Sequence, residues 1–233
     1  MACTFLNLSF LTFRRVFVTN NIKYAHIELE TPNSYIGLER AVRDPNSPPP
    51  KPVSNYPRFS AQVNQTDSGA VYYELNRHFT NFGTAWPTDR TFRVTAGAST
   101  IVQFRVQDFG MEKCTLTLST GMTLPESGHH GRRDAGHAHP TPAGRMDLWQ
   151  LDQARAIDPQ RLSWRTRPKR SRLVTSWDLA HSASLRTDEF ACKSASIITF
   201  ELACSGQEDC LLDFTQSKEG SESAFMLVQH SSL

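Results

Sequence analysis

The sequence lacks any apolar run long enough to cross a lipid bilayer as a helix, which takes about 20 residues. Its most apolar stretch, CTFLNLSFLTFRRVFV (3–18), is interrupted by Asn7 and ended by Arg14 and Arg15. This stretch has no basic residue ahead of its apolar part and no small-residue cleavage site, so it does not fit a secretory signal peptide. We predict no transmembrane helix in this chain and interpret its opening as a buried or frayed N-terminal segment.

The sequence also lacks the short motifs that mark many catalytic and metal sites. It has no GxSxG elbow, no HExxH pair, no glycine-rich phosphate loop and no CxxC spacing. Four histidines in the loop-like stretch PESGHHGRRDAGHAHPTPAG (125–144) could converge on a metal ion. They are His129, His130, His137 and His139. Because only Asp134 is close enough in sequence to orient them, we predict no metal site, and we also predict no cofactor.

An excess of charge of one sign is absent as well. The 25 basic and 23 acidic residues give a formal net charge of +2. Such a balance predicts no general attraction to nucleic acid or to anionic lipid. The hydrophobic share of 39% is sufficient for a packed interior and argues against global disorder.

Alternation of apolar and polar residues is the dominant pattern that is present. In TFRVTAGASTIVQFRVQDFGMEKCTLTLST (91–120) it predicts strands with one apolar face. One face collects Val102, Phe104 and Val106, followed by Cys114, Leu116 and Leu118. Ile101 and Gln103 then belong to the opposite face. The pattern predicts two consecutive strands of an antiparallel sheet.

The same alternation recurs elsewhere between turn-rich segments. It appears at 61–63, 70–73, 198–204, 210–214 and 224–230, whereas helical periodicity is limited to about one turn at 151–157. Many short strands separated by turns are typical of a sandwich or jelly roll. The sequence therefore predicts an all-β, antiparallel β-sandwich or jelly-roll-like fold with an irregular N-terminal segment.

A proline-dense stretch, RDPNSPPPKPVSNYPR (43–58), suggests a boundary in the chain. Such composition favours a semi-rigid polyproline conformation. We predict a poorly defined N-terminal segment at 1–42, a connector at 43–57 and the sandwich at 58–233. Within the sandwich we expect a mobile loop at 125–144.

Cysteines are few, and four of the five lie in the second half of the chain. They are Cys3, Cys114, Cys192, Cys204 and Cys210. Cys204 and Cys210 flank a short polar turn, so a hairpin can bring their Cα atoms within the roughly 4.4–6.8 Å that a disulfide needs. Cys114 and Cys192 are then paired by elimination. Four cysteines allow three connectivities, and buried free thiols are the alternative.

Disulfides would place the chain in an extracytoplasmic compartment or the lumen of the secretory pathway. Asn64, in the tripeptide NQT, fits the pattern for N-glycosylation, as does Asn7 in NLS. Asn64 is our glycosylation candidate. A cytoplasmic chain would instead keep its thiols reduced and carry no glycan.

The basic run RLSWRTRPKRSR (161–172) contains the candidate binding residues Trp164, Arg165 and Arg167. A tryptophan among arginines on a sheet surface can stack on a sugar ring or anchor a protein partner. The alternative is an edge segment with Trp164 in the core and arginines outward, because charges protect edge strands. Under the binding hypothesis a glycan or a protein is the ligand.

Paired carboxylates would favour a third hypothesis, a glycoside hydrolase, in which they lie about 5–10 Å apart. The carboxylates available in the strand-rich region are Glu74, Asp89, Asp108 and Glu112. Solvation at the surface explains these residues equally well. The sequence therefore predicts no catalytic residues.

Several blocks of sequence resemble, as a set and in this order, a family of basidiomycete-type fungal proteins with a But-type C-terminal domain. The blocks are SYIGLER (34–40), TDRTFRV (88–94), STIVQFRVQDFGMEKCTLTL (99–118), LDQARAIDPQRLSWRTRP (151–168), TFELAC (199–204) and LVQH (227–230). The domain is named after a binder of an enzyme that activates a ubiquitin-like protein. The resemblance covers about residues 34–233.

The resemblance implies an antiparallel β-sandwich without known catalytic residues or an established cofactor. Its members look like single-pass membrane proteins in which a connector and the sandwich follow one apolar helix. In this chain the charged segment NIKYAHIELE (21–30) stands where that helix is expected. Membrane anchorage, although seen in similar proteins, is therefore not predicted here.

Together these observations favour a non-catalytic β-sandwich module for binding or interaction, outside the cytoplasm. The first alternative is an intracellular adaptor for an enzyme that activates a ubiquitin-like protein. The second alternative is a hydrolase acting on cell-wall material.

Overall fold

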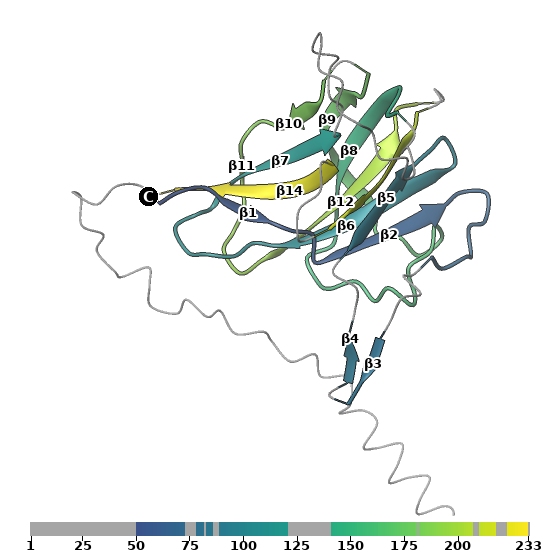
Figure 1. Ribbon diagram of the computed structural model, residues 1–233, viewed down its shortest axis with the longest axis horizontal. Helices are drawn as coiled ribbons and strands as arrows, with labels where there is room; N and C mark the ends of the chain where they lie inside the picture. Colours follow the sequence, from purple (N-terminus) through teal and green to yellow (C-terminus); the bar gives the residue numbers. More distant parts are fainter. Residues whose placement is uncertain are drawn as a thin grey trace, which may run out of the picture. The chain divides into compact units, whose positions relative to one another are not determined.

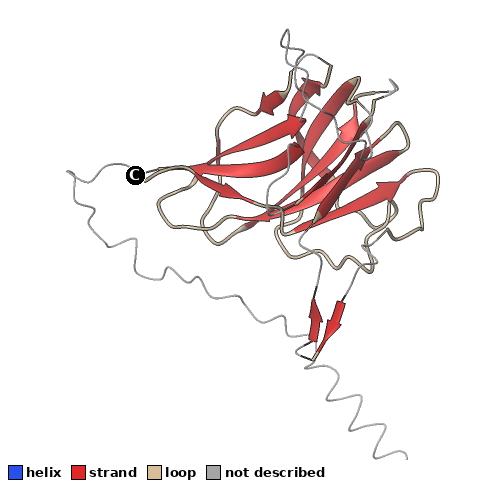
Figure 2. Cartoon of the chain, in the orientation of Figure 1, coloured by secondary structure: helices blue, strands red, loops and turns tan. Residues whose placement is uncertain are grey.

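The structure is a computed structural model that describes residues 50–72, 78–81, 83–85, 89–120, 141–180, 182–206, 210–217 and 223–232. These residues belong to one compact unit of the chain, Gly37–Leu233. They form strands and no helix (Figure 2). The strands are β1 (Val53–Asn55), β2 (Phe59–Asn64), β3 (His78–Thr80), β4 (Gly83–Ala85), β5 (Arg90–Val94), β6 (Ala98–Arg105), β7 (Lys113–Thr120), β8 (Arg145–Leu151), β9 (Arg170–Asp178), β10 (Ser184–Arg186), β11 (Phe190–Ala191), β12 (Ile197–Cys204), β13 (Leu212–Gln216) and β14 (Ser223–His230).

Two antiparallel sheets form the sandwich (Figure 1). Sheet A has the strand order β1-β14-β7-β10, with β11 also paired to β7, and sheet B has the order β2-β6-β12-β8-β9. In sheet B the register of β6 and β12 places Val102 opposite Phe200. In sheet A, Leu116 of β7 lies opposite Leu227 of β14. The predicted all-β sandwich is confirmed.

The main hydrophobic core contains residues of both sheets. The side chains predicted for it from 91–120 are all fully buried: Val102, Phe104, Val106, Cys114, Leu116 and Leu118. Phe225 of β14 makes edge-to-face contacts with Phe92, Phe104 and Trp177, with ring centroids 5.9, 5.6 and 6.4 Å away. Such aromatic contacts add to the stabilisation that burial itself provides. The alternation in the sequence therefore identified the inward face correctly.

Strands β5 and β13 form a separate ribbon that is hydrogen-bonded to both sheets. The Phe225 N–H of β14 donates to Gln216 Oε1 of β13 over 2.8 Å. On the other side, Thr100 Oγ1 of β6 accepts from the Arg93 N–H (3.0 Å) and donates to the Arg93 carbonyl (2.7 Å). Phe92 and Phe214, one from each ribbon strand, stack with centroids 4.7 Å apart and belong to the main core.

Some details of the local prediction are wrong. Residues 70–72 form no strand, and 151–157 forms no helical turn. Strand β1 lies inside the predicted connector and pairs with β14. At the end of the predicted mobile loop, Ala143 forms a bridge with Leu211, whereas 125–140 lies outside the described residues, as do 1–49. The predicted three-part division of the chain stays a prediction.

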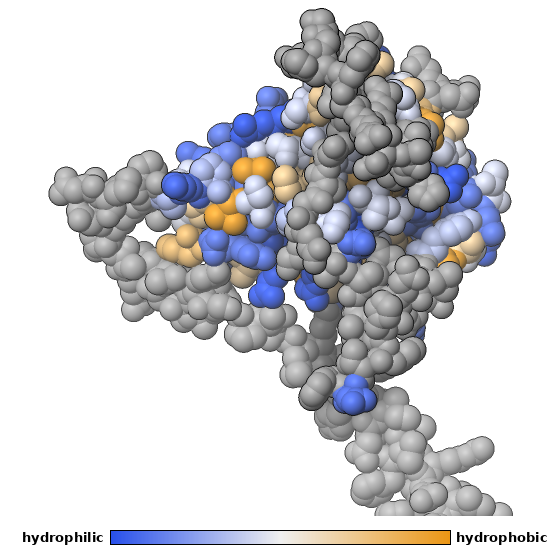
Figure 3. All heavy atoms as spheres, in the orientation of Figure 1, coloured by the Kyte–Doolittle hydropathy of each residue, from blue (hydrophilic) through white to orange (hydrophobic). Residues whose placement is uncertain are grey.

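The described surface is mainly hydrophilic on the face shown in Figure 3, with small separate apolar spots. Among the described residues, the large hydrophobic side chains with substantial exposure are Tyr72 and Leu173, at 38% and 45%. Isolated exposed apolar residues are normal for soluble proteins.

Candidate functional site

A second hydrophobic cluster lies on the face of sheet B that points away from the main core. It consists of Ala61, Val63, Ile101, Leu151 and Leu162, with Phe59, Trp149, Ile157 and Trp164 packed against it. Residues 152–169, which connect β8 to β9 and are called the covering segment below, contribute Leu162, Ile157 and Trp164 to it. Ile101 is completely buried by this layer. The sequence alone gave no sign that both faces of sheet B are covered.

Buried polar side chains attach the covering segment to the sheet. Gln103 Nε2 donates to the Arg155 carbonyl (2.7 Å), and Gln103 Oε1 accepts from the Ile157 N–H (3.1 Å). Thr199 Oγ1 donates to the Gln153 carbonyl (2.8 Å). Because buried polar groups are costly when unpaired, these bonds favour one position of the segment over others.

A turn within the covering segment positions Trp164. Thr166 Oγ1 donates to the Arg161 carbonyl (2.5 Å) and accepts from the Ser163 N–H (2.9 Å). The Arg165 N–H donates to the Ser68 carbonyl (3.0 Å), and Arg165 Nη2 to Ser68 Oγ (3.4 Å). Arg165 is thereby directed to the turn that follows β2.

Trp164 and Arg167 are in direct contact. The Arg167 guanidinium carbon lies 3.5 Å from the Trp164 ring centroid, and Arg167 Nη1 donates to the Trp164 carbonyl (2.7 Å). A guanidinium over an indole face is a favourable cation–π arrangement. Of the three residues predicted from the sequence, the structure brings these two together and places Arg165 with Ser68 instead.

Sequence analysis missed a buried carboxylate beneath this pair, Glu201 of β12, whose side chain is 0% exposed. Arg170 binds it with both ends of its guanidinium group, through Nε to Oε2 (2.8 Å) and Nη2 to Oε1 (3.0 Å). Ser99 Oγ donates to Oε1 as well (2.7 Å). Arg170 reaches Glu201 past Trp149 of the intervening strand β8, with its guanidinium carbon 5.0 Å from that ring centroid.

The two arginines differ in how closely they are matched to Glu201. The hydrogen bonds to Glu201 raise the pKa of Arg170 above its ordinary value. Burial lowers the pKa of Arg167; the nearby Arg170 lowers it further, while Glu201 opposes both effects. Arg167 Nε lies 3.9 Å from Glu201 Oε1, which is too far for a hydrogen bond. Both groups remain charged at neutral pH, but Arg167 is the less well compensated.

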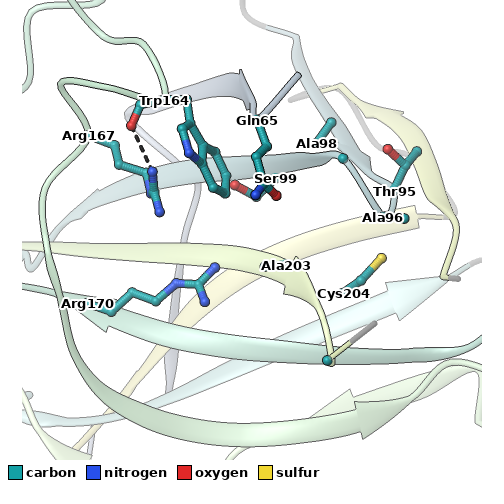
Figure 4. A pocket seen from close by; sticks show the side chains of 12 residues that line it. Gln65, Thr95, Ala96, Ala98, Ser99, Trp164, Arg167, Arg170, Ala203 and Cys204 are labelled. Carbon is teal, nitrogen blue, oxygen red and sulfur yellow. Dashed lines mark hydrogen bonds between the residues drawn. The ribbon is translucent and has the colours of Figure 1, made fainter. Parts of the chain in front are cut away.

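Trp164, Arg167 and Arg170 border a pocket of about 210 Å³. Figure 4 shows Trp164, Arg167 and Arg170 toward one end, Cys204 toward the other, and Gln65 between them. No aspartate or glutamate is among the described residues that line it. The pocket therefore has a cationic and aromatic end without an acidic side chain of its own.

The four late cysteines form two disulfides. Cys114 bonds to Cys192, with Cα atoms 5.9 Å apart, and Cys204 bonds to Cys210, with Cα atoms 5.5 Å apart. The pairing is the one that the hairpin argument favours. Cys114 and Cys192 belong to the main core, whereas the partly buried Cys204 borders the pocket.

Asn64, the glycosylation candidate, is the last residue of β2. Its Oδ1 accepts from the Thr66 N–H (2.9 Å) and from Thr66 Oγ1 (2.5 Å). The following residue, Gln65, is exposed and lines the pocket. A modification at Asn64 would therefore be attached next to the pocket rim.

The structure does not bring the other candidate residues that it describes together in a site. Asp89 precedes β5, and Asp108 and Glu112 follow β6; none of them lines the pocket. Glu112 accepts hydrogen bonds from the Gly110 N–H and the Ser232 hydroxyl. Glu74 lies outside the described residues, and so do the four loop histidines. Within the described ranges no three His, Cys, Asp or Glu side chains gather as metal ligands.

Two further findings concern the chain as a whole. In the part that the structure describes, there is no helix of sufficient length and apolarity to cross a membrane. The family model of the ubiquitin 3 binding protein But2 C-terminal domain matches residues 80–220, which is more than half of the chain and includes the strands and arginines of the pocket. The chain matches no curated protein.

Proposed function

The chain belongs to the But2 C-terminal domain family, and on this premise we propose that it is a non-catalytic protein-binding module that contacts its partner through Trp164 and Arg167. The family description speaks of a protein that binds ubiquitin 3, so membership supports a protein as the class of partner. The sequence prediction left a glycan open as well. The contacts of Trp164 support a protein rather than a glycan.

The observation that carries this proposal is the pairing of Trp164 with Arg167 at the rim of the pocket. Tryptophan and arginine are the side chains most often responsible for binding energy in protein interfaces. Arg167 covers one face of the indole at 3.5 Å, and the side chain also packs against the second hydrophobic cluster. That ring face is therefore closed to a sugar, while the polar edge of the guanidinium is open to a protein partner.

A photocrosslinking amino acid at position 165 tests this role in cells that express the full chain. Arg165 is exposed and adjacent to Trp164, so crosslinking there should trap a defined partner. Trp164→Ala in the same chain should lower the yield at least tenfold, because truncation of an interface tryptophan commonly costs 2 kcal/mol or more. The yield is measured by quantitative mass spectrometry of the captured product.

The matched control carries the photocrosslinker at Glu189, an exposed position between β10 and β11 at sheet A. Since Trp164 also packs on the second cluster, Arg167→Met serves as a second variant, which removes the guanidinium group and leaves Trp164 unchanged. Equal capture from positions 165 and 189, or capture unaffected by both variants, would refute the proposed contact surface.

We also propose that the module works in an oxidising compartment, outside the cytoplasm or in the secretory pathway, and that Asn64 carries a glycan. The two disulfides support the compartment, because such bonds persist mainly where thiols are not kept reduced. The Thr66 hydroxyl bonded to the Asn64 side chain is compatible with recognition of the NQT tripeptide.

Peptide mapping of the native protein, with and without reductant, checks both statements. We expect peptides linked through the two cysteine pairs, and a glycan at Asn64 that disappears in Asn64→Gln. Thr66→Ala should remove the glycan too, because it destroys the acceptor pattern while leaving Asn64 in place. Fully reduced thiols together with an unmodified Asn64 would instead favour the intracellular adaptor.

A further inference from the structure

The two arginines at the cationic end of the pocket are unequally compensated by acidic groups. Arg167 and Arg170 both face Glu201. The buried Asp147 carboxylate lies near Arg170 and helps to raise its pKa, so Arg170 has two acidic neighbours, whereas the acidic contact of Arg167 is Glu201 at 3.9 Å. Glu201 is fully buried, while 24% of the Arg167 side chain and 34% of the Arg170 side chain remain exposed. Arg167, the less well compensated of the two arginines, is therefore partly accessible to a ligand.

Arg167 has hydrogen-bonding capacity that the described residues leave unused. A guanidinium group has five N–H donors, and that of Arg167 makes one hydrogen bond, to the Trp164 carbonyl. Glu201 accepts three hydrogen bonds from Arg170 and Ser99, and Arg167 remains 3.9 Å away from it. The contact with the Trp164 ring and the hydrogen bond to the Trp164 carbonyl restrict the Arg167 side chain, which reduces the conformational entropy lost when a ligand binds to it.

The size and charge of the site limit the chemistry of its ligand. A pocket of about 210 Å³ accommodates one small group rather than an oligosaccharide. A monovalent anion would pair with Arg167, whereas the second charge of a phosphate would be repelled by the buried Glu201 and Asp147 carboxylates. A carboxylate also matches the planar fork of an arginine in two parallel hydrogen bonds.

We infer that this pocket binds a carboxylate of the protein partner, held by Arg167 above Glu201. The inference rests on the proposed protein-binding role and specifies the chemistry of its contact. The carboxylate belongs either to an acidic side chain or to the C-terminus of the partner. Both present the same group to Arg167, and peptides of different design distinguish them.

Titration of the full chain with short acetylated peptides tests the inference at constant ionic strength. One peptide has a free C-terminus, the second has an amidated C-terminus and one internal glutamate, and the third is amidated and uncharged. We expect at least one of the carboxylate peptides to shift the Trp164 indole N–H resonance in a saturable manner, and the uncharged peptide not to do so. The carboxylate peptide that binds more tightly shows whether the carboxylate of the partner belongs to a side chain or to the C-terminus.

Substitutions test whether Arg167 is the residue that binds the carboxylate. Arg167→Gln should weaken binding of the carboxylate peptide at least tenfold. Arg167→Lys retains the positive charge but not the planar guanidinium group, and it should weaken binding less. Arg165→Gln is the matched control, because Arg165 lies in the same segment, bonds to Ser68 and does not line the pocket. Its effect should stay within about twofold, as expected for the loss of an exposed charge.

Three results would overturn the inference: no saturable shift with either carboxylate peptide, equal weakening by the Arg165 and Arg167 variants, or tighter binding of an amidated phosphoserine peptide. Such a failure can be told apart from failure of the proposed function. If photocrosslinking at position 165 still depends on Trp164 while no carboxylate peptide binds, the protein contact stands and only its carboxylate chemistry is wrong.

Discussion

Replacement of both Cys114 and Cys192 by alanine is expected to lower the free energy of unfolding by roughly 4 to 5 kcal/mol. This disulfide joins residues 78 positions apart and connects β7 to the residue that follows β11. Without it the unfolded chain gains the freedom of a long loop, which is the principal effect of a crosslink in the loop-entropy account. Both cysteines are also buried in the main core, so their loss removes packing contacts too.

The second disulfide provides an internal comparison. Cys204 and Cys210 are only six positions apart, and the same loop-entropy relation gives about 2 kcal/mol for their removal. Urea unfolding of the two double-alanine variants, followed by tryptophan fluorescence, measures both losses. Equal losses, or a larger loss for the Cys204–Cys210 pair, would contradict the assignment of the long crosslink as the main covalent constraint on the sandwich.

The fold could be predicted because the inward residues alternate over complete strands. Leu116 and Leu118 of β7, or Phe200 and Leu202 of β12, can only share a face if the backbone is extended. The pattern fails where side chains on both faces are buried. Ile101 and Gln103 were assigned to the face opposite the core, and they are as buried as their inward neighbours because the covering segment lies over them.

The candidate site could be predicted only in part for the same reason. Trp164 and Arg167 were recognisable as candidate binding residues since they stand close together in a basic run, and the structure places them in contact with each other. Arg170 and Glu201 lie 31 positions apart, on strands β9 and β12 that are separated by β8. Their pairing depends on the strand order of sheet B and on Trp149 between them. No local pattern in the sequence encodes this order.

Arg170→Met is expected to destabilise the protein by about 3 kcal/mol, because it leaves the buried Glu201 carboxylate without its principal partner. The remaining hydrogen bond from Ser99 and the ion pair with Arg167 at 3.9 Å compensate only part of that charge. Partial exposure of Arg170 places the expected loss at the lower end of the range for buried ion pairs. Urea unfolding of the variant measures it.

Two comparisons distinguish the destabilisation caused by an unpaired buried charge from that caused by the loss of a long side chain. Arg170→Met combined with Glu201→Gln should recover much of the stability, since the second change removes the uncompensated charge. Arg93→Met disrupts an exposed ion pair with Asp213, in which the atoms are 3.8 Å apart, and should cost less than about 1 kcal/mol. If Arg170→Met costs no more than Arg93→Met, Arg170 does not stabilise a buried carboxylate, and Arg167 is then the counter-ion of Glu201 rather than a free cation at the pocket.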